Sequence, residues 1–410
     1  MLNEPPSLET AAARSPRSFW PVIIAYAFAV SSAMALQLTF APITTVAATH
    51  FQVSVQAIGW LSQIFTLLYV VLGMPMGIAL DRWFRGSLAV GAALSILGAM
   101  LRLGGNSFAW VLSGQLLAAV AQPLLLNGVT KIAGEYLSEE DRPLGISLGM
   151  ASMYAGELIA IGAGTVLSTP EHVHSVILVN SAFAVLAMTV FLVFLRRPAE
   201  FGITAAPPAG LASLRTVLSD PFMRVVAVLA FIGFGTFTSY MTWLQALLAP
   251  AGIAADQAGI MLLGFVVGGI VGAMVLPKAV AKHKREFALM LAAVGVGCIV
   301  CLLLAVTPHL GVGMVGVPLI GLLQLSTLPV IMEMTERRAA RAAATASALV
   351  WMSGNAGATV ISITVQNTIE RPYTAFLFLA AITAVSAPLV FLLRRLASRA
   401  PASAIGLGVA

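Results

Sequence analysis

Residues 77–85 read Gly-Ile-Ala-Leu-Asp-Arg-Trp-Phe-Arg and interrupt two long apolar runs, 55–80 and 86–103. A helix needs about 20 apolar residues to cross the core of a bilayer, and each run is of that order. An acid and two arginines at such a break can pair with each other, or hold a neighbouring helix end through its dipole. The stretch therefore predicts two membrane-spanning helices joined by a short charged turn.

The same alternation of apolar runs and charged breaks extends over all 410 residues. Hydrophobic side chains make up 59% of the chain. Asp, Glu, Lys and Arg make up 9%, against roughly 25% in soluble domains. So few charges could not cover the surface of a soluble fold, so the composition excludes a cytosolic enzyme, a nucleic-acid-binding protein and a disordered chain. The apolar runs also lack the period-two alternation of a membrane barrel.

Apolar runs between charged or turn-rich breaks predict about twelve spans. The first six are 19–48, 55–80, 86–103, 108–132, 144–168 and 174–195. The second six are 222–248, 256–281, 286–306, 311–334, 341–367 and 373–393. Because a polar loop at 196–221 separates the two sets, we predict an all-α membrane protein with two pseudo-symmetric six-helix bundles, 19–195 and 222–393, and a site between them.

The basic residues predict the orientation of these spans. With the N-terminus placed inside, 20 of the 22 Lys and Arg fall in inside segments, and only Arg102 and Arg371 fall outside. Positively charged loops stay on the cytoplasmic side, so we expect cytoplasmic tails at 1–18 and 394–410 in a multi-pass protein of the inner cell membrane. The bias also accounts for the net charge of +6 without a nucleic-acid partner.

The pattern of residues 77–85, G-x-x-x-D-R-x-x-R, resembles the signature of the major facilitator superfamily, which lies in the loop between spans 2 and 3. The resemblance covers the whole chain and implies a transporter whose loop acid, here Asp81, helps to latch the two halves in one conformation. The charges could instead only set the topology. The residues for which we predict a gating role are Gly77, Asp81, Arg82, Arg85, Glu135, Asp141 and Arg142.

Parts of the chain depart from the family pattern. Residues 272–278 keep a glycine and a basic residue without the acid, span 4 lacks an arginine that the family often has, and span 5 lacks the Gly-Pro pair of antiporters. A narrower resemblance, to the feline leukaemia virus subgroup C receptor-related branch, is carried by Gly114, Gln115, Gln122, Lys131 and Glu333–Thr335. That branch is associated with choline or haem transport. Its span 1 tryptophan has no counterpart here, and Gln37 lies near that place.

Polar side chains deep in the spans predict the substrate site, because burying a polar group in hydrocarbon is costly. Glu157 is the acid that lies clearly inside a span, roughly 20 Å along it at 1.5 Å per residue. Tyr154 lies one turn earlier on the same face. The residues for which we predict substrate binding are Gln37, Gln122, Tyr154, Glu157, Phe237, Tyr240, Gln324 and Asn355. The alternative for the amides and Tyr240 is interhelical bonding or packing.

Glu157 has two candidate roles. Burial favours a neutral carboxyl, which would take and release a proton as the cavity opens to each side. A charged carboxyl would instead pair with a cationic substrate beside aromatic rings. A protonated Glu bonded to a backbone carbonyl is the structural alternative. No Lys, Arg or His lies at mid-depth, which favours a small cationic, zwitterionic or neutral organic solute over an anion. We expect a monomer that works by alternating access, driven by protons or by the solute gradient.

Other classes fit the sequence less well. A multidrug or metabolite efflux antiporter would carry the missing Gly-Pro pair, and a non-transporting receptor would have long external loops. An intramembrane enzyme would need a nucleophile and base, or a metal cluster, at one depth. The histidines lie in loops or span ends, and Cys298 and Cys301 lie in an apolar run that suits packing. We therefore expect no metal and no cofactor.

Overall fold

The computed structural model describes residues 18–199, 201, 215, 217–338 and 343–398. The predicted N-terminal tail apart from Ser18, much of the predicted central loop and the end of the C-terminal tail lie outside these residues. The described chain is helical, and it contains 12 helices long and apolar enough to cross a membrane. The predicted fold class is confirmed, and the protein is a multi-pass membrane protein.

The first six spanning helices form one half of the molecule. Their bounds are α1 (Trp20–Leu38), α3 (Val55–Arg82), α4 (Phe84–Leu101), α5 (Phe108–Leu126), α7 (Arg142–Val166) and α8 (Val173–Leu195). Short helices join them: η1 (Ala41–Ile43), α2 (Thr44–Phe51), α6 (Val129–Tyr136) and η2 (Pro170–His172).

The second half repeats this arrangement. Its spans are α10 (Pro221–Leu248), α11 (Ala255–Lys282), α12 (Glu286–Val306), α13 (Leu310–Arg338), α14 (Ala343–Gln366) and α15 (Pro372–Ala397), with η3 (Ala249–Ala251) after α10. In the first half α1 packs on α7 and α3 on α5. The corresponding pairs in the second half, α10 with α14 and α11 with α13, also pack together. The matching pairs are the pseudo-symmetry that the 6+6 pattern predicted.

The first predicted span, 19–48, is interrupted. Helix α1 ends at Leu38, and the Thr39 hydroxyl donates back to the Ala35 carbonyl over 2.8 Å. Pro42 lacks an amide hydrogen, so it cannot donate the helical bond to the Leu38 carbonyl that would continue α1. The chain therefore turns through η1 and continues as the separate helix α2.

The fourth predicted span, 108–132, is interrupted for a related reason. Helix α5 ends at Leu126, within one turn of Pro123, and α6 begins at Val129. Proline removes one helical hydrogen-bond donor, which weakens the turn around it. The segment that follows is the short helix α6, which carries Lys131 and Glu135.

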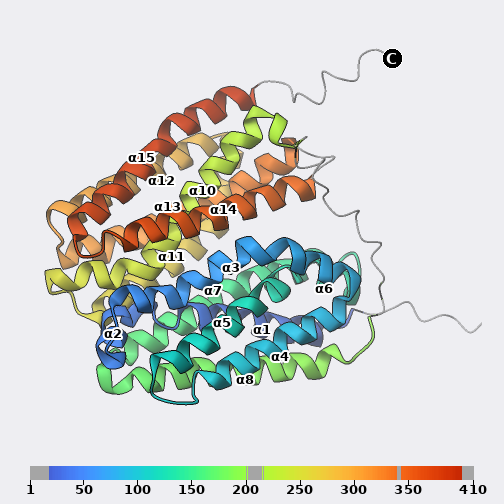
Figure 1. Ribbon diagram of the computed structural model, residues 1–410. Helices are drawn as coiled ribbons and strands as arrows, with labels where there is room; N and C mark the ends of the chain where they lie inside the picture. Colours follow the sequence, from blue (N-terminus) through green and yellow to red (C-terminus); the bar gives the residue numbers. More distant parts are fainter. Residues whose placement is uncertain (1–17, 200, 202–214, 216, 339–342, 399–410) are drawn as a thin grey trace, which may run out of the picture.

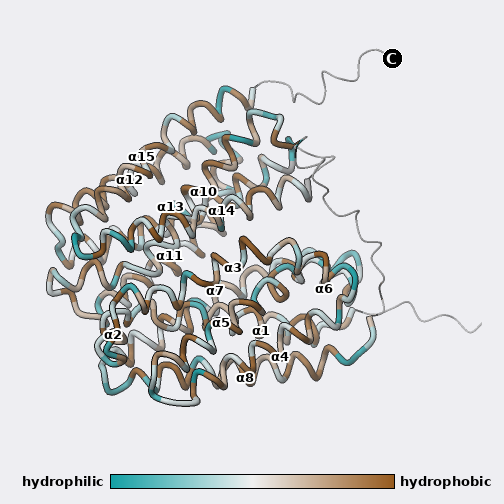
Figure 2. Tube along the Cα trace, in the orientation of Figure 1, coloured by the Kyte–Doolittle hydropathy of each residue, from teal (hydrophilic) through white to brown (hydrophobic). Residues whose placement is uncertain are grey.

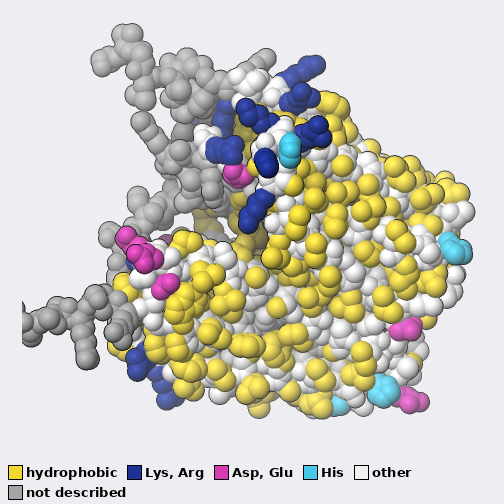
Figure 3. Space-filling view, turned by 180° about the vertical axis from the view of Figure 1, so that it is seen from behind, with side chains coloured by type: hydrophobic (Ala, Val, Ile, Leu, Met, Phe, Trp, Pro, Cys, Tyr) yellow, Lys and Arg dark blue, Asp and Glu magenta, His cyan; other side chains and the backbone are white. Residues whose placement is uncertain are grey.

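The two halves meet at one end and separate toward the other (Figure 1). Hydrophobic residues fill the spans, and hydrophilic residues gather at their ends (Figure 2). On the face shown in Figure 3, the Lys and Arg side chains gather at one end. We call this the basic end, and its described members include Arg82, Arg85, Lys131, Arg142, Arg196, Arg224, Lys282, Arg337 and Arg394. The opposite end consists of segments 39–54, 102–107, 167–172, 249–254, 307–309 and 367–371.

Candidate functional site

A cavity of about 600 Å³ lies between the two halves. Helices α1, α3, α5, α6 and α7 line it on one side, and α10, α13 and α14 line it on the other. Seven of the eight predicted binding residues line this cavity: Gln37, Gln122, Tyr154, Glu157, Phe237, Gln324 and Asn355. Residues far apart in the sequence but at one depth are thus brought together.

Glu157 is the one Asp, Glu, Lys, Arg or His among the described residues that line the cavity. Its side chain is 7% exposed, and its Oε2 atom is enclosed with no hydrogen-bond partner in the described part of the chain. The neighbouring Gly156 lets α7 approach α1, because a Cβ atom there would overlap the Ser31 carbonyl. The backbone next to the carboxyl is therefore held firmly while the carboxyl itself stays unpaired.

The amides of the cavity wall bridge neighbouring helices. The Gln122 amide Nε2 donates to Gln37 Oε1 over 2.7 Å. The Gln324 amide Nε2 donates to the Gly233 carbonyl over 2.8 Å and to Thr236 Oγ1 over 2.7 Å. The remaining predicted amide, Asn355, donates to the Trp351 carbonyl of its own helix over 3.0 Å. Gln37, Gln122 and Gln324 thus bond between helices while they line the cavity, and their role in substrate binding stays a prediction.

Several aromatic and polar residues that the sequence did not predict also line the cavity. Trp351 and Phe234 form a T-shaped pair with ring centroids 5.4 Å apart. The Tyr69 hydroxyl donates to Asn127 Oδ1 over 2.6 Å, and Asn127 Nδ2 donates to the Gly73 carbonyl over 2.9 Å. Their only signal in the sequence is a polar or aromatic side chain within an apolar run. Residues that only pack against their neighbours give the same signal. The wall thus offers aromatic faces near a carboxyl.

Tyr240 does not join the other seven residues. It is 2% exposed, lines a smaller cavity inside the second half, and places its hydroxyl 2.9 Å from Cys301 Sγ. Its ring also packs against Phe265, with centroids 5.8 Å apart. This geometry matches the alternative that Tyr240 is a packing residue. It also places Cys301 in a packed environment.

The two halves are in contact at the opposite end. Trp243 of α10 packs on Gly59 of α3, where a Cβ atom would overlap the indole ring. Reciprocally, Thr165 of α7 packs on Gly259 of α11. A single buried apolar cluster there contains residues of both halves.

Hydrogen bonds reinforce this contact. The Thr45 amide donates to Gln245 Oε1 over 2.9 Å, and Gln245 Nε2 donates to Thr45 Oγ1 over 2.7 Å. The Thr44 hydroxyl lies 3.4 Å from the Thr242 carbonyl. These bonds tie α2 to α10. The opposite end is therefore closed, whereas the surface is hollowed between the halves beside the basic side chains (Figure 3).

The predicted gating residues gather at the basic end of the first half. Asp81 pairs with Lys131 at 3.1 Å. Arg85 holds the end of α8 by donating to the Leu195 carbonyl over 2.7 Å and to the Arg196 carbonyl over 2.6 Å. Gly77 lies at the cavity side of α3, where its Cβ position is 3.9 Å from Asn127 Nδ2. Asp81 and Arg85 thus act within the first half in this conformation.

The remaining gating candidates also bond locally. Arg142 donates to the Leu137 carbonyl over 3.2 Å and to the Gly134 carbonyl over 3.3 Å. Asp141 Oδ2 accepts a bond from the Ser138 hydroxyl over 3.2 Å. Among the described residues, no hydrogen bond or ion pair links these side chains to the second half. The remaining two, Arg82 and Glu135, lie beside a separate groove that is described below.

No group of three or more His, Cys, Asp or Glu residues that could hold a metal occurs within the described ranges. Two six-helix bundles around one central cavity are the arrangement of multi-pass membrane transporters. The sequence profile of the Major Facilitator Superfamily matches residues 18–362, and the chain belongs to this family. Members of this family are transporters of small solutes.

Relatives and solved structures agree with this assignment. Solute carrier family 49 member A3 of Danio rerio is 29% identical over 365 residues, which are 82% of this chain and 75% of that protein. The choline/ethanolamine transporter FLVCR2 of Rattus norvegicus is 28% identical over 148 residues, 35% of this chain and 27% of that protein. Both resemblances that the sequence suggested are confirmed.

The fold is shared with solved transporters of low sequence identity. A POT family transporter in complex with 5-aminolevulinic acid has a TM-score of 0.74 at 13% identity, covering 94% of this chain and 99% of that one. A bacterial homolog of the human lysosomal transporter Spinster, in an inward-facing and unoccupied conformation, has a TM-score of 0.67 at 13% identity, covering 92% and 95%.

Proposed function

We propose that this protein carries a small organic cation or zwitterion through the inner cell membrane by alternating access, with Glu157 as the group that recognises positive charge. The observation that supports this most is the unpaired Glu157 carboxyl in a cavity whose described lining has no Lys, Arg or His. A buried carboxylate without a partner is unfavourable, so a ligand that supplies a positive group is stabilised there. An anion would meet the same charge and be repelled.

The aromatic wall supports a cation in particular. Rings of Phe237, Phe234 and Trp351 line the cavity, and aromatic faces attract ammonium groups. The rat relative is named as a transporter of choline and ethanolamine, which are small positively charged amino alcohols. We include such amines among the substrates to be tested. A neutral solute bound through Gln37 and Gln122 is the alternative.

Proton coupling follows from the same carboxyl. A proton and a cationic group compete for Glu157, so the site holds one or the other when it is exposed to either side. Under the predicted topology the basic end is cytoplasmic, and the structure is then the conformation open to the cytoplasm. The closed contact at the opposite end would separate when the cavity opens to the outside.

A thermal-shift screen of the purified protein tests the proposed substrate class. Small amines and zwitterions are expected to raise the melting temperature, since a ligand that binds only the folded state stabilises it. Matched carboxylates of the same size are expected to give no shift. Hits are then tested for uptake into proteoliposomes. A shift with carboxylates alone would contradict the proposed role of Glu157.

Replacing Asp81 by Asn tests the gating role. The substitution removes the ion pair with Lys131 but leaves the cavity, which it does not line, unchanged. We expect turnover to fall several-fold, while equilibrium binding of the ligand found in the screen stays within twofold. Arg371→Gln, at the opposite end, is the matched control. Loss of binding would show that Asp81 acts on the site and not on the conformational change.

A further inference from the structure

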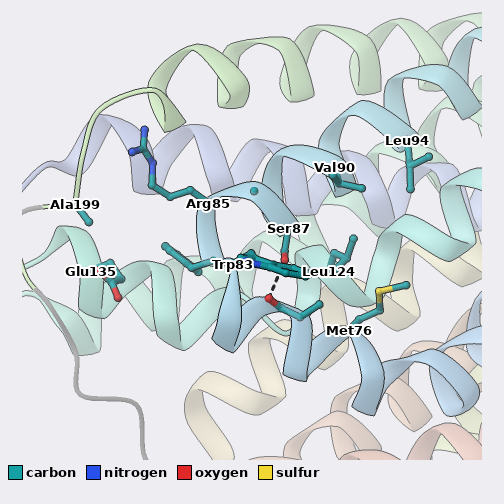
Figure 4. A pocket seen from close by; sticks show the side chains of 12 residues that line it. Met76, Trp83, Arg85, Ser87, Val90, Leu94, Leu124, Glu135 and Ala199 are labelled. Atoms are coloured by element: carbon teal, nitrogen blue, oxygen red, sulfur yellow. Dashed lines mark hydrogen bonds between the residues drawn. The ribbon is translucent and has the colours of Figure 1, made fainter.

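A second cavity, of about 900 Å³, lies in the first half beside the turn between α3 and α4. It shares none of its lining residues with the central cavity. Apolar side chains form its walls: Met76 from α3, Val90 and Leu94 from α4 and Leu124 from α5, with Trp83 at its centre (Figure 4). Its volume is at the upper end of that of ligand pockets in proteins. We call it the turn groove.

The turn groove faces the bilayer. Val90 is 52% exposed, and Leu97, two turns further along α4 on the same face, is 49% exposed. Exposed apolar side chains on a spanning helix contact lipid tails. Trp83 is 65% exposed and lies at the junction of span and turn, which is the depth where tryptophan prefers to lie in a membrane.

Arginines surround the mouth of the groove. Arg85 lines it, and the Arg82 guanidinium lies 5.3 Å from the centre of the Trp83 ring. Two further arginines, Arg196 and Arg197, follow the end of α8: the Arg196 carbonyl accepts a bond from Arg85, and the Arg197 guanidinium lies 4.7 Å from the centre of the Phe19 ring.

Fewer acids face this mouth. Glu135 also lines the groove, and its carboxyl points away from the Arg85 guanidinium (Figure 4). Asp81 lies nearby on the same turn, but it is paired with Lys131. Glu139 lies 3.9 Å from Arg142. The arginines therefore leave an excess of positive charge beside an apolar channel.

We propose that the turn groove binds an anionic glycerophospholipid from the surrounding bilayer, with an acyl chain along Met76, Val90 and Leu94 and the phosphate at Arg82. Arg85 adds positive charge nearby while its guanidinium stays bonded to the end of α8. Apolar burial holds the chain, and charge selects the headgroup. Basic residues at the membrane surface attract anionic lipids by about fivefold in affinity for each arginine involved. A headgroup recognised through its amine would instead use Glu135.

Quenching of Trp83 fluorescence tests this proposal. The full chain is reconstituted in phosphatidylcholine vesicles, and brominated phosphatidylglycerol or brominated phosphatidylcholine is added. The difference between the native chain and Trp83→Phe isolates the signal of Trp83. We expect phosphatidylglycerol to quench at a several-fold lower mole fraction, and we expect Arg82→Gln to remove this preference. Equal quenching by both lipids would overturn the proposal.

A matched pair of variants tests the groove itself. Val90→Phe fills it, whereas Val193→Phe places the same ring at a residue of α8 that is 55% exposed and does not line it. Only the first is expected to weaken quenching. A preference for phosphatidylethanolamine that Glu135→Gln abolishes would also overturn the anionic assignment. Native mass spectrometry of lipid exchange on the unmodified protein gives a second measurement if any variant fails to fold.

Discussion

Replacing Glu157 by Gln is expected to reduce transport of a cationic substrate by about 10- to 100-fold, the loss that follows from removing one hydrogen bond or ion pair to a charged group. Gln has nearly the same shape, so the contact of α7 with α1 at Gly156 is kept. The variant also removes an unpaired buried acid, so its thermal stability should not fall. Uptake into proteoliposomes over a range of pH is the measurement.

The way in which Glu157→Gln loses transport distinguishes the two proposed roles of Glu157. If binding of the cation is lost, the carboxyl recognises the substrate directly. If binding persists but uptake no longer depends on pH, the carboxyl carries the proton. Glu171→Gln, an exposed acid of η2, is the matched control and should behave as the native chain does. Native uptake by Glu157→Gln at every pH would refute both roles.

Replacing Gly59 by Val is expected to hold the opposite end open. The new side chain would overlap the Trp243 ring, and overpacking of this kind costs roughly 1 to 3 kcal/mol. The overlap exists only when the halves touch, so this cost shifts the equilibrium toward the separated state by about 5- to 150-fold. Transport should fall, because every cycle requires this contact to form again.

Accessibility of Thr242 reports the shift directly. Thr242 is 2% exposed, and its carbonyl accepts the bond from the Thr44 hydroxyl of the first half. In a background with Cys298 and Cys301 replaced by Ala, a Thr242→Cys reporter should react faster with a membrane-impermeant maleimide when Gly59 is Val. Gly162→Val is the control, because a Cβ atom there meets nothing within 4 Å. Equal labelling of the two valine variants would show that the contact does not govern access.

Hydropathy predicted the fold because spanning helices must form all their backbone hydrogen bonds internally and must face lipid with apolar side chains. The depth of a residue along its helix also predicted most of the proposed cavity residues. The number of residues from the helix end converts directly into a distance along the helix axis. Depth does not give the direction of a side chain around its helix. Phe237 therefore faces the cavity, while Tyr240, one turn further, faces Cys301.

Arg102 shows a second limit of sequence reasoning. A charge just beyond a span is typical of a loop in water, yet Arg102 is 0% exposed. Its Nη2 donates to Thr39 Oγ1 over 2.8 Å, and its guanidinium lies 5.7 Å from the centre of the Phe40 ring. The contact depends on the break of the first span before Pro42, which brings Phe40 over the end of α4. Nothing local to Arg102 indicates it.

The contact at the opposite end is reciprocal: each half inserts a side chain, Trp243 or Thr165, against a glycine of the other. Neither insertion can be half made, because a partly withdrawn indole loses its contacts without gaining room for water. The two insertions also belong to rigid bundles and must form or break together. Passage between the two orientations is therefore expected to be an abrupt, all-or-none switch without a populated halfway state.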